Sequence, residues 1–221
     1  AYNIRANGKK AARGTTANID IVTKDDKDGI DIFIKPGTKN ESVHIPVVLS
    51  ESGLQDMVYN DFFIGEGSDV TIVAGCGIHN CGNCGVQESR HDGIHTFYVG
   101  KNARVRYVER HYGEGDGRGE NVMNPTTVVH MEEGSYMEME TTQIKGVDST
   151  LRCTQADLGP DATLIIKEKV MTHGKQDAKS DFTVDLNGKG CRTNVISRSV
   201  ARGESKQVFL ARINGNAACY G

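Results

Sequence analysis

The sequence predicts an all-β protein, specifically a parallel β-helix, and three observations support this fold class. Val, Ile and Thr number 20, 16 and 16 of the 221 residues, whereas Leu occurs only 7 times. β-Branched side chains fit a pleated strand and lose rotamer freedom in a helix, so this composition argues against a helical bundle. The 26 glycines, with scattered Asn and Asp, indicate many tight corners. The third observation is a repeated unit in which such a corner precedes an alternating strand.

The first 65 residues predict four extended segments. Alternating isoleucines indicate strands at residues 19–21 and 30–34, joined by a turn at residues 26–29. Residues 42–49 are predicted as a third strand and residues 54–64 as a further apolar segment. Because no segment keeps a helical period and no linker composition interrupts the chain, we expect a single domain spanning all 221 residues.

From about residue 65 onward, a turn of Gly, Asn, Asp or Ser is repeatedly followed by alternating β-branched residues. Self-similarity on a scale of about 20–50 residues is typical of a solenoid whose coils stack strand on strand. A β-sandwich of hairpins is the alternative, because it also has alternating strands between turns. The alternation of apolar and charged residues at 104–109 suits a strand with one solvent-facing side. The copies begin at Gly67, Gly100, Gly134, Gly159, Gly188 and Gly203.

Charge and hydropathy exclude several classes of partner. With 26 Lys and Arg against 29 Asp and Glu, the net charge is −3, and there is no basic run of the kind that binds nucleic acid. The apolar runs fall far short of the roughly 20 residues of a membrane helix. The first residues also lack the apolar core of a secretory signal. We therefore expect a soluble cytoplasmic protein without nucleic-acid or membrane partners.

The densest candidate chemistry is a glycine-rich run at residues 75–85 with three of the six cysteines, followed by two histidines. Clustered cysteines in a reducing compartment favour metal binding over a disulfide framework. A Cys-x2-Cys spacing lets two thiolates bind one ion, and Cys with His suits zinc or an iron–sulfur cluster. The alternatives are buried corner thiols or a redox disulfide. The candidate metal ligands are Cys76, His79, Cys81, Cys84, His91 and His95.

The remaining histidines carry weaker signals. The spacing of His91 and His95 resembles a helical metal pair, but the intervening Asp92 and Gly93 make a helix improbable. Taken alone, this spacing favours a surface or hydrogen-bonded residue over a metal ligand for either histidine. The histidines that stand alone on strand-like segments are interpreted as structural. These are His44, His111, His130 and His173.

Two further motifs and three single cysteines are interpreted structurally. The glycine-rich run at 113–119 lacks the Lys-Ser/Thr of a phosphate loop and is predicted to be a loop leaving the solenoid. Glu138 and Glu140 share one strand face, which favours a solvated ladder over catalytic or calcium-binding carboxylates. Three separate cysteines could align vertically as a sulfur column in stacked coils, or simply act as small buried residues. They are Cys153, Cys191 and Cys219.

A resemblance to a known family is carried by residues 76–81, 88–95, 97–103, 107–115, 137–150, 167–174, 195–201 and 213–216. Through these segments the sequence over residues 42–221 resembles the SufB/SufD family, the scaffold proteins of the SUF iron–sulfur cluster assembly system. The resemblance implies a right-handed parallel β-helix and a non-catalytic scaffold that binds no nucleotide directly. It also implies pairing through β-helix ends, as a homodimer or a SufB/SufD-type heterodimer, and a SufC-type ABC ATPase as partner. The cargo or cofactor would be an iron–sulfur cluster or zinc.

The sequence departs from the family pattern at its C-terminal residues, 217–221. Family members usually continue to a Gly-His-x-Glu-Cys-Asp stretch and then to helices that dock the ATPase, and neither is present here. We therefore expect either a fragment or another docking mode, with weak binding of a SufC-type partner by this chain. An unpaired coil edge recruits other strands, so a homodimer through a β-helix end is expected.

Two other functions compete with an iron–sulfur scaffold. A carbohydrate-active β-helix enzyme needs aromatic side chains that stack on sugars, and 6% aromatics without Trp argue against it. A structural β-helix module with zinc at a corner is the other alternative. Metal content and the visible absorbance of anaerobically purified protein discriminate between them.

Overall fold

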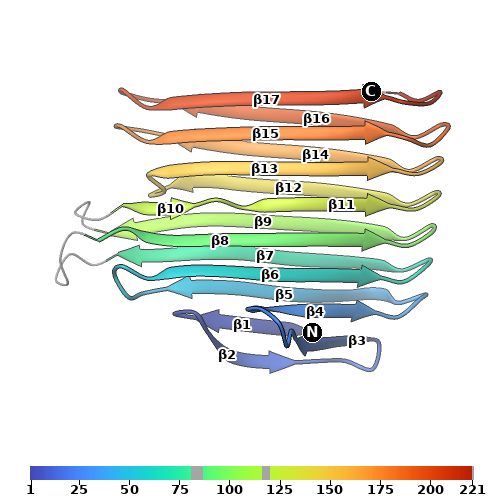
Figure 1. Cartoon of the computed structure of the whole chain (residues 1–221), viewed down its shortest axis with the longest axis horizontal. Helices are drawn as coiled ribbons and strands as arrows, with labels where there is room; N and C mark the ends of the chain where they lie inside the picture. The colour runs from blue at the N-terminus through green and yellow to red at the C-terminus, as the bar shows by residue number, and fades with distance from the viewer. Residues whose placement is uncertain (81–86, 116–119, 221) are drawn as a thin grey trace.

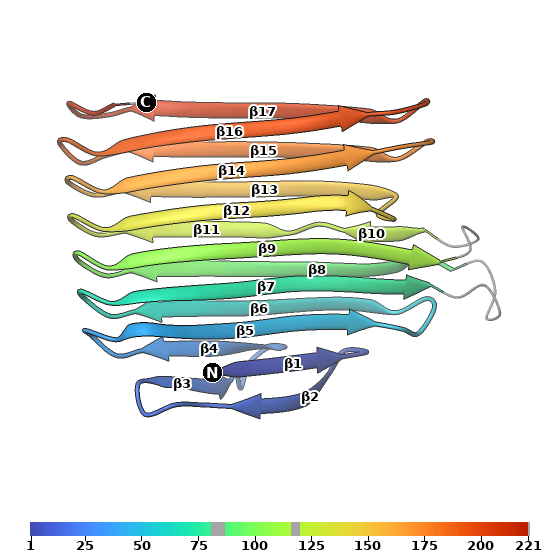
Figure 2. The same cartoon turned by 180° about the vertical axis from the view of Figure 1, so that it is seen from behind.

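The computed structural model describes residues 1–80, 87–115 and 120–220. Over these residues the chain forms strands and no helix, and therefore no helix that could cross a membrane. The strands stack into two parallel sheets, one behind the other (Figure 1). Successive coils run to the right in the front sheet and return to the left in the back sheet while climbing, so the solenoid is right-handed (Figures 1 and 2). The predicted parallel β-helix is confirmed.

Each coil contributes one strand, or two short strands in line, to each sheet. Sheet A contains β5 (Lys39–Leu49), β7 (Asp69–Asn80), β9 (Arg104–Gly115), β12 (Tyr136–Lys145), β14 (Thr163–Thr172) and β16 (Arg192–Ala201). Sheet B contains β6 (Gln55–Ile64), β8 (Ser89–Val99), β10 (Asn121–Met123), β11 (Thr126–Met131), β13 (Ser149–Leu158), β15 (Asp177–Leu186) and β17 (Lys206–Gly215). β10 and β11 share one row between β8 and β13.

The N-terminal segment closes the first coil with antiparallel strands. β1 (Tyr2–Ala6) pairs with β5 and with the antiparallel β2 (Lys9–Gly14). β3 (Ile19–Thr23) and β4 (Gly29–Ile34) form the hairpin that the isoleucine pattern predicts, and β4 extends sheet B beside β6. Short antiparallel strands thus cover the sheet edges at this end, which protects them from pairing with other chains.

Glycine is required at the corner that precedes sheet A because adjacent coils approach closely there. A Cβ on Gly188 would lie 2.1 Å from the carbonyl carbon of Gly159 in the coil below. Two residues later, the backbone of Gly190 adopts a φ of +74°, which favours glycine. Five of the six predicted repeat copies lie at this corner. Gly203 instead precedes β17 at the opposite corner, half a coil away, which explains why the last copy follows Gly188 after only 15 residues.

The interior contains a polar layer between two apolar clusters. The larger cluster includes the stacked rings of Phe62 and Phe97, whose centroids lie 4.4 Å apart. The smaller cluster packs around Leu49 and Ile78 near the opposite corner. Glu109 is only 2% exposed in the layer between them. The interpretation of residues 104–109 as a strand with its charges on the solvent-facing side is therefore wrong for Glu109, which shares the inward face with Val105 and Tyr107 and pairs there with Arg152.

Candidate functional site

Strand β7 separates two of the predicted metal ligands. Successive side chains of a strand point to opposite faces, so Cys76 lies inside the solenoid and His79 outside. His79 is exposed, with Nδ1 3.9 Å from Oε2 of Glu114. Cys81 and Cys84 lie outside the described residues. Of the predicted ligands on this segment, the structure therefore places only Cys76 in the interior.

Strand β8 brings the other two predicted ligands together. His91, Gly93 and His95 occupy alternate positions and all face the interior, because a spacing of four is even and keeps one strand face. A Cβ built on Gly93 would lie 3.2 Å from Nε2 of His91 and 3.5 Å from Nε2 of His95. The missing side chain of Gly93 thus leaves a hollow that both imidazole Nε2 atoms reach.

Hydrogen bonds fix the orientation of His95. The Tyr107 hydroxyl donates to Oε1 of Glu109 over 2.9 Å and lies 2.8 Å from Nδ1 of His95. Since the hydroxyl proton is used for Glu109, Nδ1 of His95 must donate to the hydroxyl oxygen. Nε2 is then the acceptor nitrogen, and the Asn60 amide lies 3.3 Å from it. Full burial lowers the pKa of His95 to about 4, which keeps the ring neutral.

His91 is oriented by a separate pair of charged residues. Nδ1 of His91 lies 2.9 Å from Oδ2 of Asp56, and Arg5 donates to Oδ1 of Asp56 over 2.8 Å. Although burial alone would raise it, these hydrogen bonds hold the pKa of the Asp56 carboxyl below its ordinary value. A carboxylate on Nδ1 directs Nε2 of the same ring toward a ligand, as in many metal-binding histidines.

The two histidines border a small cavity of about 20 Å³, which is enough for one water-sized species. Cys76 reaches this cavity from sheet A, and burial raises the pKa of its thiol well above the ordinary value. The cavity is therefore lined by Nε2 of His91, by Nε2 of the neutral His95, which the Asn60 amide contacts, and by a protonated thiol. Its polar lining residues are Cys76, His91, His95, Glu109 and His111.

A buried ion network lies beside the cavity. Arg152 donates to Oε2 of Glu109 through Nη1, and its Nε lies 3.6 Å from Oε1 of Glu168. Nη2 of Arg152 also lies 3.3 Å from Nδ1 of His111. Although burial alone would raise it, His111 and Arg152 hold the pKa of the Glu109 carboxyl well below its ordinary value. The interior thus carries buried charges of both signs next to the candidate ligands.

In the described parts of the chain, no three Cys, His, Asp or Glu side chains are already arranged to hold a metal ion. The donors stand around a shared hollow without converging on one point. Most of the polar residues around the cavity are not among the site residues predicted from the sequence. The alternating strand pattern could have indicated them, since each lies at an inward-facing position of its strand. They are Asp56, Asn60, Tyr107, Glu109, Arg152 and Glu168.

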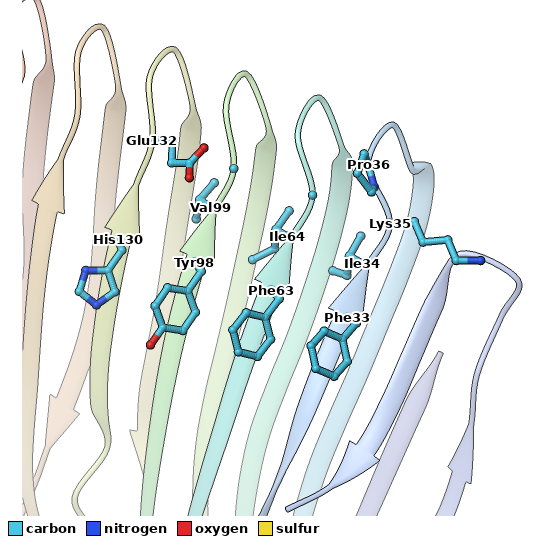
Figure 3. A pocket seen from close by; sticks show the side chains of 12 residues that line it. Phe33, Ile34, Lys35, Pro36, Phe63, Ile64, Tyr98, Val99, His130 and Glu132 are labelled. Atoms are coloured by element: carbon cyan, nitrogen blue, oxygen red, sulfur yellow. The ribbon is translucent and has the colours of Figure 1, made fainter.

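A second hollow, of about 430 Å³, lies on the outside of sheet B (Figure 3). Phe33, Phe63 and Tyr98 stack face to face along it, with centroids 4.9 and 5.0 Å apart, and His130 continues the stack at 5.2 Å. Because the rings cover one another's faces, little face area remains for stacking on a sugar. The outward Glu138 and Glu140 pair with Lys167 and Lys169, which confirms the predicted solvated ladder. Neither feature favours a carbohydrate-active enzyme.

The geometry defines a right-handed β-helix with a polar, histidine-lined interior, and comparison with known proteins assigns its family. Residues 51–219 match the family model described as "SUF system FeS cluster assembly, SufBD core domain". The chain belongs to this family, which confirms the resemblance seen in the sequence and supports involvement in iron–sulfur cluster assembly.

Two curated proteins are similar to this chain. A protein described as an iron–sulfur cluster assembly SufBD family protein from Methanocaldococcus jannaschii is 27% identical over 188 residues, covering 84% of this chain and 57% of the relative. One of the same description from Archaeoglobus fulgidus is 28% identical over 196 residues, covering 87% and 50%. The chain spans about half the length of these relatives. No solved structure matches it significantly.

Proposed function

We propose that this chain is a non-catalytic scaffold for iron–sulfur cluster assembly whose interior cavity receives iron as cargo. Family membership supports the assembly role. The observation that carries the proposed site is the hollow over Gly93, which Nε2 of His91 and Nε2 of His95 both approach. Imidazole nitrogen and thiolate are both established ligands of iron and zinc in proteins.

The arrangement suits reversible rather than permanent binding. The donors are oriented by outer partners, namely Asp56 for His91 and Tyr107 for His95, but they do not converge into a closed cage. Cys76 must lose a proton before it can bind a metal, so binding at this cavity releases protons and strengthens as the pH rises. A scaffold that passes its cargo on needs this kind of binding.

The proposed partners follow from the SUF system. A SufC-type ABC ATPase would supply the nucleotide chemistry, since the interior described here offers metal donors rather than a phosphate-binding loop. The last coil exposes large apolar side chains, with Val208 47% and Phe209 44% exposed on β17. We propose this face for pairing with a second copy or a SufB/SufD-type partner. Light scattering that finds only monomer at high concentration would contradict self-pairing.

The test of the cargo site is iron binding by anaerobically purified protein. We expect about one Fe(II) per chain for the wild type, and at least a tenfold weaker affinity for His91→Gln, His95→Gln and Cys76→Ser. Cys153→Ser is the matched control, because Cys153 faces away from the interior on β13. Less than about 0.1 equivalent of bound iron in the wild type, together with no visible absorbance after reconstitution with sulfide, would overturn the proposal.

The sequence also nominated Cys81, Cys84 and His79, and the same measurement decides their role. If the cysteines contribute ligands, Cys81→Ser and Cys84→Ser lower the iron stoichiometry or abolish the absorbance. His79→Gln is expected to have no effect, since His79 lies on the outer face of β7.

A further inference from the structure

The corner before each sheet A strand carries a column of small buried side chains. Ser68, Ala103, Ser135, Ala162 and Cys191 each directly precede a strand of sheet A, and none is more than 1% exposed. Each is tied to the next coil in the same way. For example, the Arg104 amide donates to the Ser68 carbonyl over 2.7 Å, and the Arg192 amide to the Ala162 carbonyl over 2.9 Å.

Cys219 continues this column directly above Cys191. The Tyr220 amide donates to the Cys191 carbonyl over 2.9 Å, which repeats the bond made at every earlier corner. The Thr193 amide donates to the Tyr220 carbonyl over 3.0 Å, and Arg192 and Tyr220 form a parallel bridge. Neighbouring strands lie about 4.8 Å apart, within the range of Cα separations that a disulfide bridges.

The two cysteines lie close together and differ in accessibility. The Cys219 side chain packs against the buried cluster that contains Cys191, and its Sγ would lie 3.3 Å from a Cβ on Gly215. Cys191 is fully buried, whereas Cys219 is only partly buried. Cys153, the third member of the predicted sulfur column, lies on β13 in sheet B and does not join it.

We propose that Cys191 and Cys219 are a disulfide-forming pair, oxidised by small disulfides such as oxidised glutathione. The other described positions in the column hold Ser or Ala, with Thr38 before β5, so two cysteines are stacked only at this last pair of coils. Cys219 is the attacking thiol because an oxidant cannot reach Cys191.

The exchange balances without any further oxidant. The Cys219 thiolate attacks one sulfur of glutathione disulfide and forms a mixed disulfide, and one glutathione thiolate leaves. The Cys191 thiolate then attacks Sγ of Cys219, the mixed disulfide breaks and the second glutathione leaves. The two protein thiols lose two electrons to the glutathione disulfide, and their two protons end on the two glutathione thiols.

The bond would fasten the segment that follows β17 onto the preceding corner. This segment is otherwise held by backbone bonds, among them the Gly190 amide to the Ala218 carbonyl at 2.6 Å. A cross-link between Cys191 and Cys219 closes a loop that contains the whole of β16 and β17. Oxidation should therefore stabilise the last coil, whose outer edge is unpaired in the described structure.

The test treats the native chain with oxidised glutathione, blocks free thiols with iodoacetamide in denaturant and maps the peptides by mass spectrometry. We expect a linked peptide pair containing Cys191 and Cys219 that dithiothreitol separates. Hydrogen exchange at the Gly190, Thr193 and Tyr220 amides should slow about tenfold or more in the oxidised protein.

Two variants provide the controls. In Cys219→Ser, Cys191 should remain fully alkylated after oxidant treatment, because its only route to the oxidant is lost. Cys153→Ser should form the Cys191–Cys219 link as the wild type does. Full alkylation of Cys191 in oxidant-treated wild type, or linkage of Cys219 to a different cysteine, would overturn the proposal. Because no metal is involved, this outcome is independent of the iron-binding test.

Discussion

Nδ1 of His95 donates a hydrogen bond over 2.8 Å to the hydroxyl oxygen of Tyr107, which fixes the tautomer of a histidine at the centre of the solenoid. Tyr107 comes from sheet A and His95 from sheet B, so the bond joins the two sheets across the interior. It leaves Nε2 of His95 as the acceptor at the edge of the Gly93 hollow. The proposed cargo site therefore depends on a residue that does not itself line the cavity.

Replacing Tyr107 with Phe removes the hydroxyl that joins His95 to Glu109. Nδ1 of His95 and Oε1 of Glu109 would then be buried without this hydrogen-bond partner. We expect a loss of about 1–3 kcal/mol in the free energy of unfolding, measured by urea denaturation. Tyr98→Phe is the control, because Tyr98 is 42% exposed on the outer face, and it should stay within about 0.5 kcal/mol of wild type. An equal loss in the free energy of unfolding for the two variants would show that the hydrogen bonds of the Tyr107 hydroxyl do not contribute to stability.

The stability of the fold should decrease in mild acid because of His95. Its folded-state pKa of about 4 lies below the ordinary 6.5, so between these values the unfolded chain binds more protons than the native chain. Stability therefore falls as the pH drops, by about 1.6 kcal/mol between pH 6.5 and pH 5. Urea unfolding across this range should show a smaller decrease for His95→Gln. Identical pH profiles for the two proteins would refute this assignment.

Arg152 should be among the residues most costly to replace. Arg152→Met would leave the carboxylates of Glu109 and Glu168 buried without their cation, which typically costs about 3–5 kcal/mol. Combining it with Glu109→Gln should recover part of this loss, because one buried charge is removed. Arg106→Met, at a residue 61% exposed and 3.7 Å from Glu140, should cost no more than about 1 kcal/mol. Chemical denaturation of the four proteins at pH 7 checks the series.

The corners and the fold could be predicted from the sequence because they depend on local properties. Glycine at positions such as Gly188 and the alternation of β-branched residues are each visible within a few neighbours. The pairing inside the polar interior could not be predicted in this way. The alternation places Glu109 on the inward face, but a carboxylate is tolerated there only because Arg152, 43 positions further along the chain, pairs with it.

The candidate ligands show the same limit. The spacing of His91 and His95 resembles a helical metal pair, but an interval of four residues also keeps two side chains on one face of a strand. The hollow between them exists because Gly93 has no side chain. The alignment of Cys219 with Cys191 depends on the exact length of the last coil. Cys153 lies within β13 of sheet B and not at this corner, so only Cys191 and Cys219 of the three cysteines are stacked.

The interior cargo site is tested by comparing Fe(II) binding by Gly93→Ala and Gly77→Ala under anaerobic conditions. A Cβ at Gly93 enters the space between the two Nε2 atoms, whereas a Cβ at Gly77, on neighbouring β7, meets nothing within 4 Å. We predict that Gly93→Ala keeps the β-sheet circular dichroism of the wild type but binds iron at least about tenfold more weakly, and that Gly77→Ala binds as the wild type does. Wild-type iron affinity in Gly93→Ala would contradict an interior cargo site.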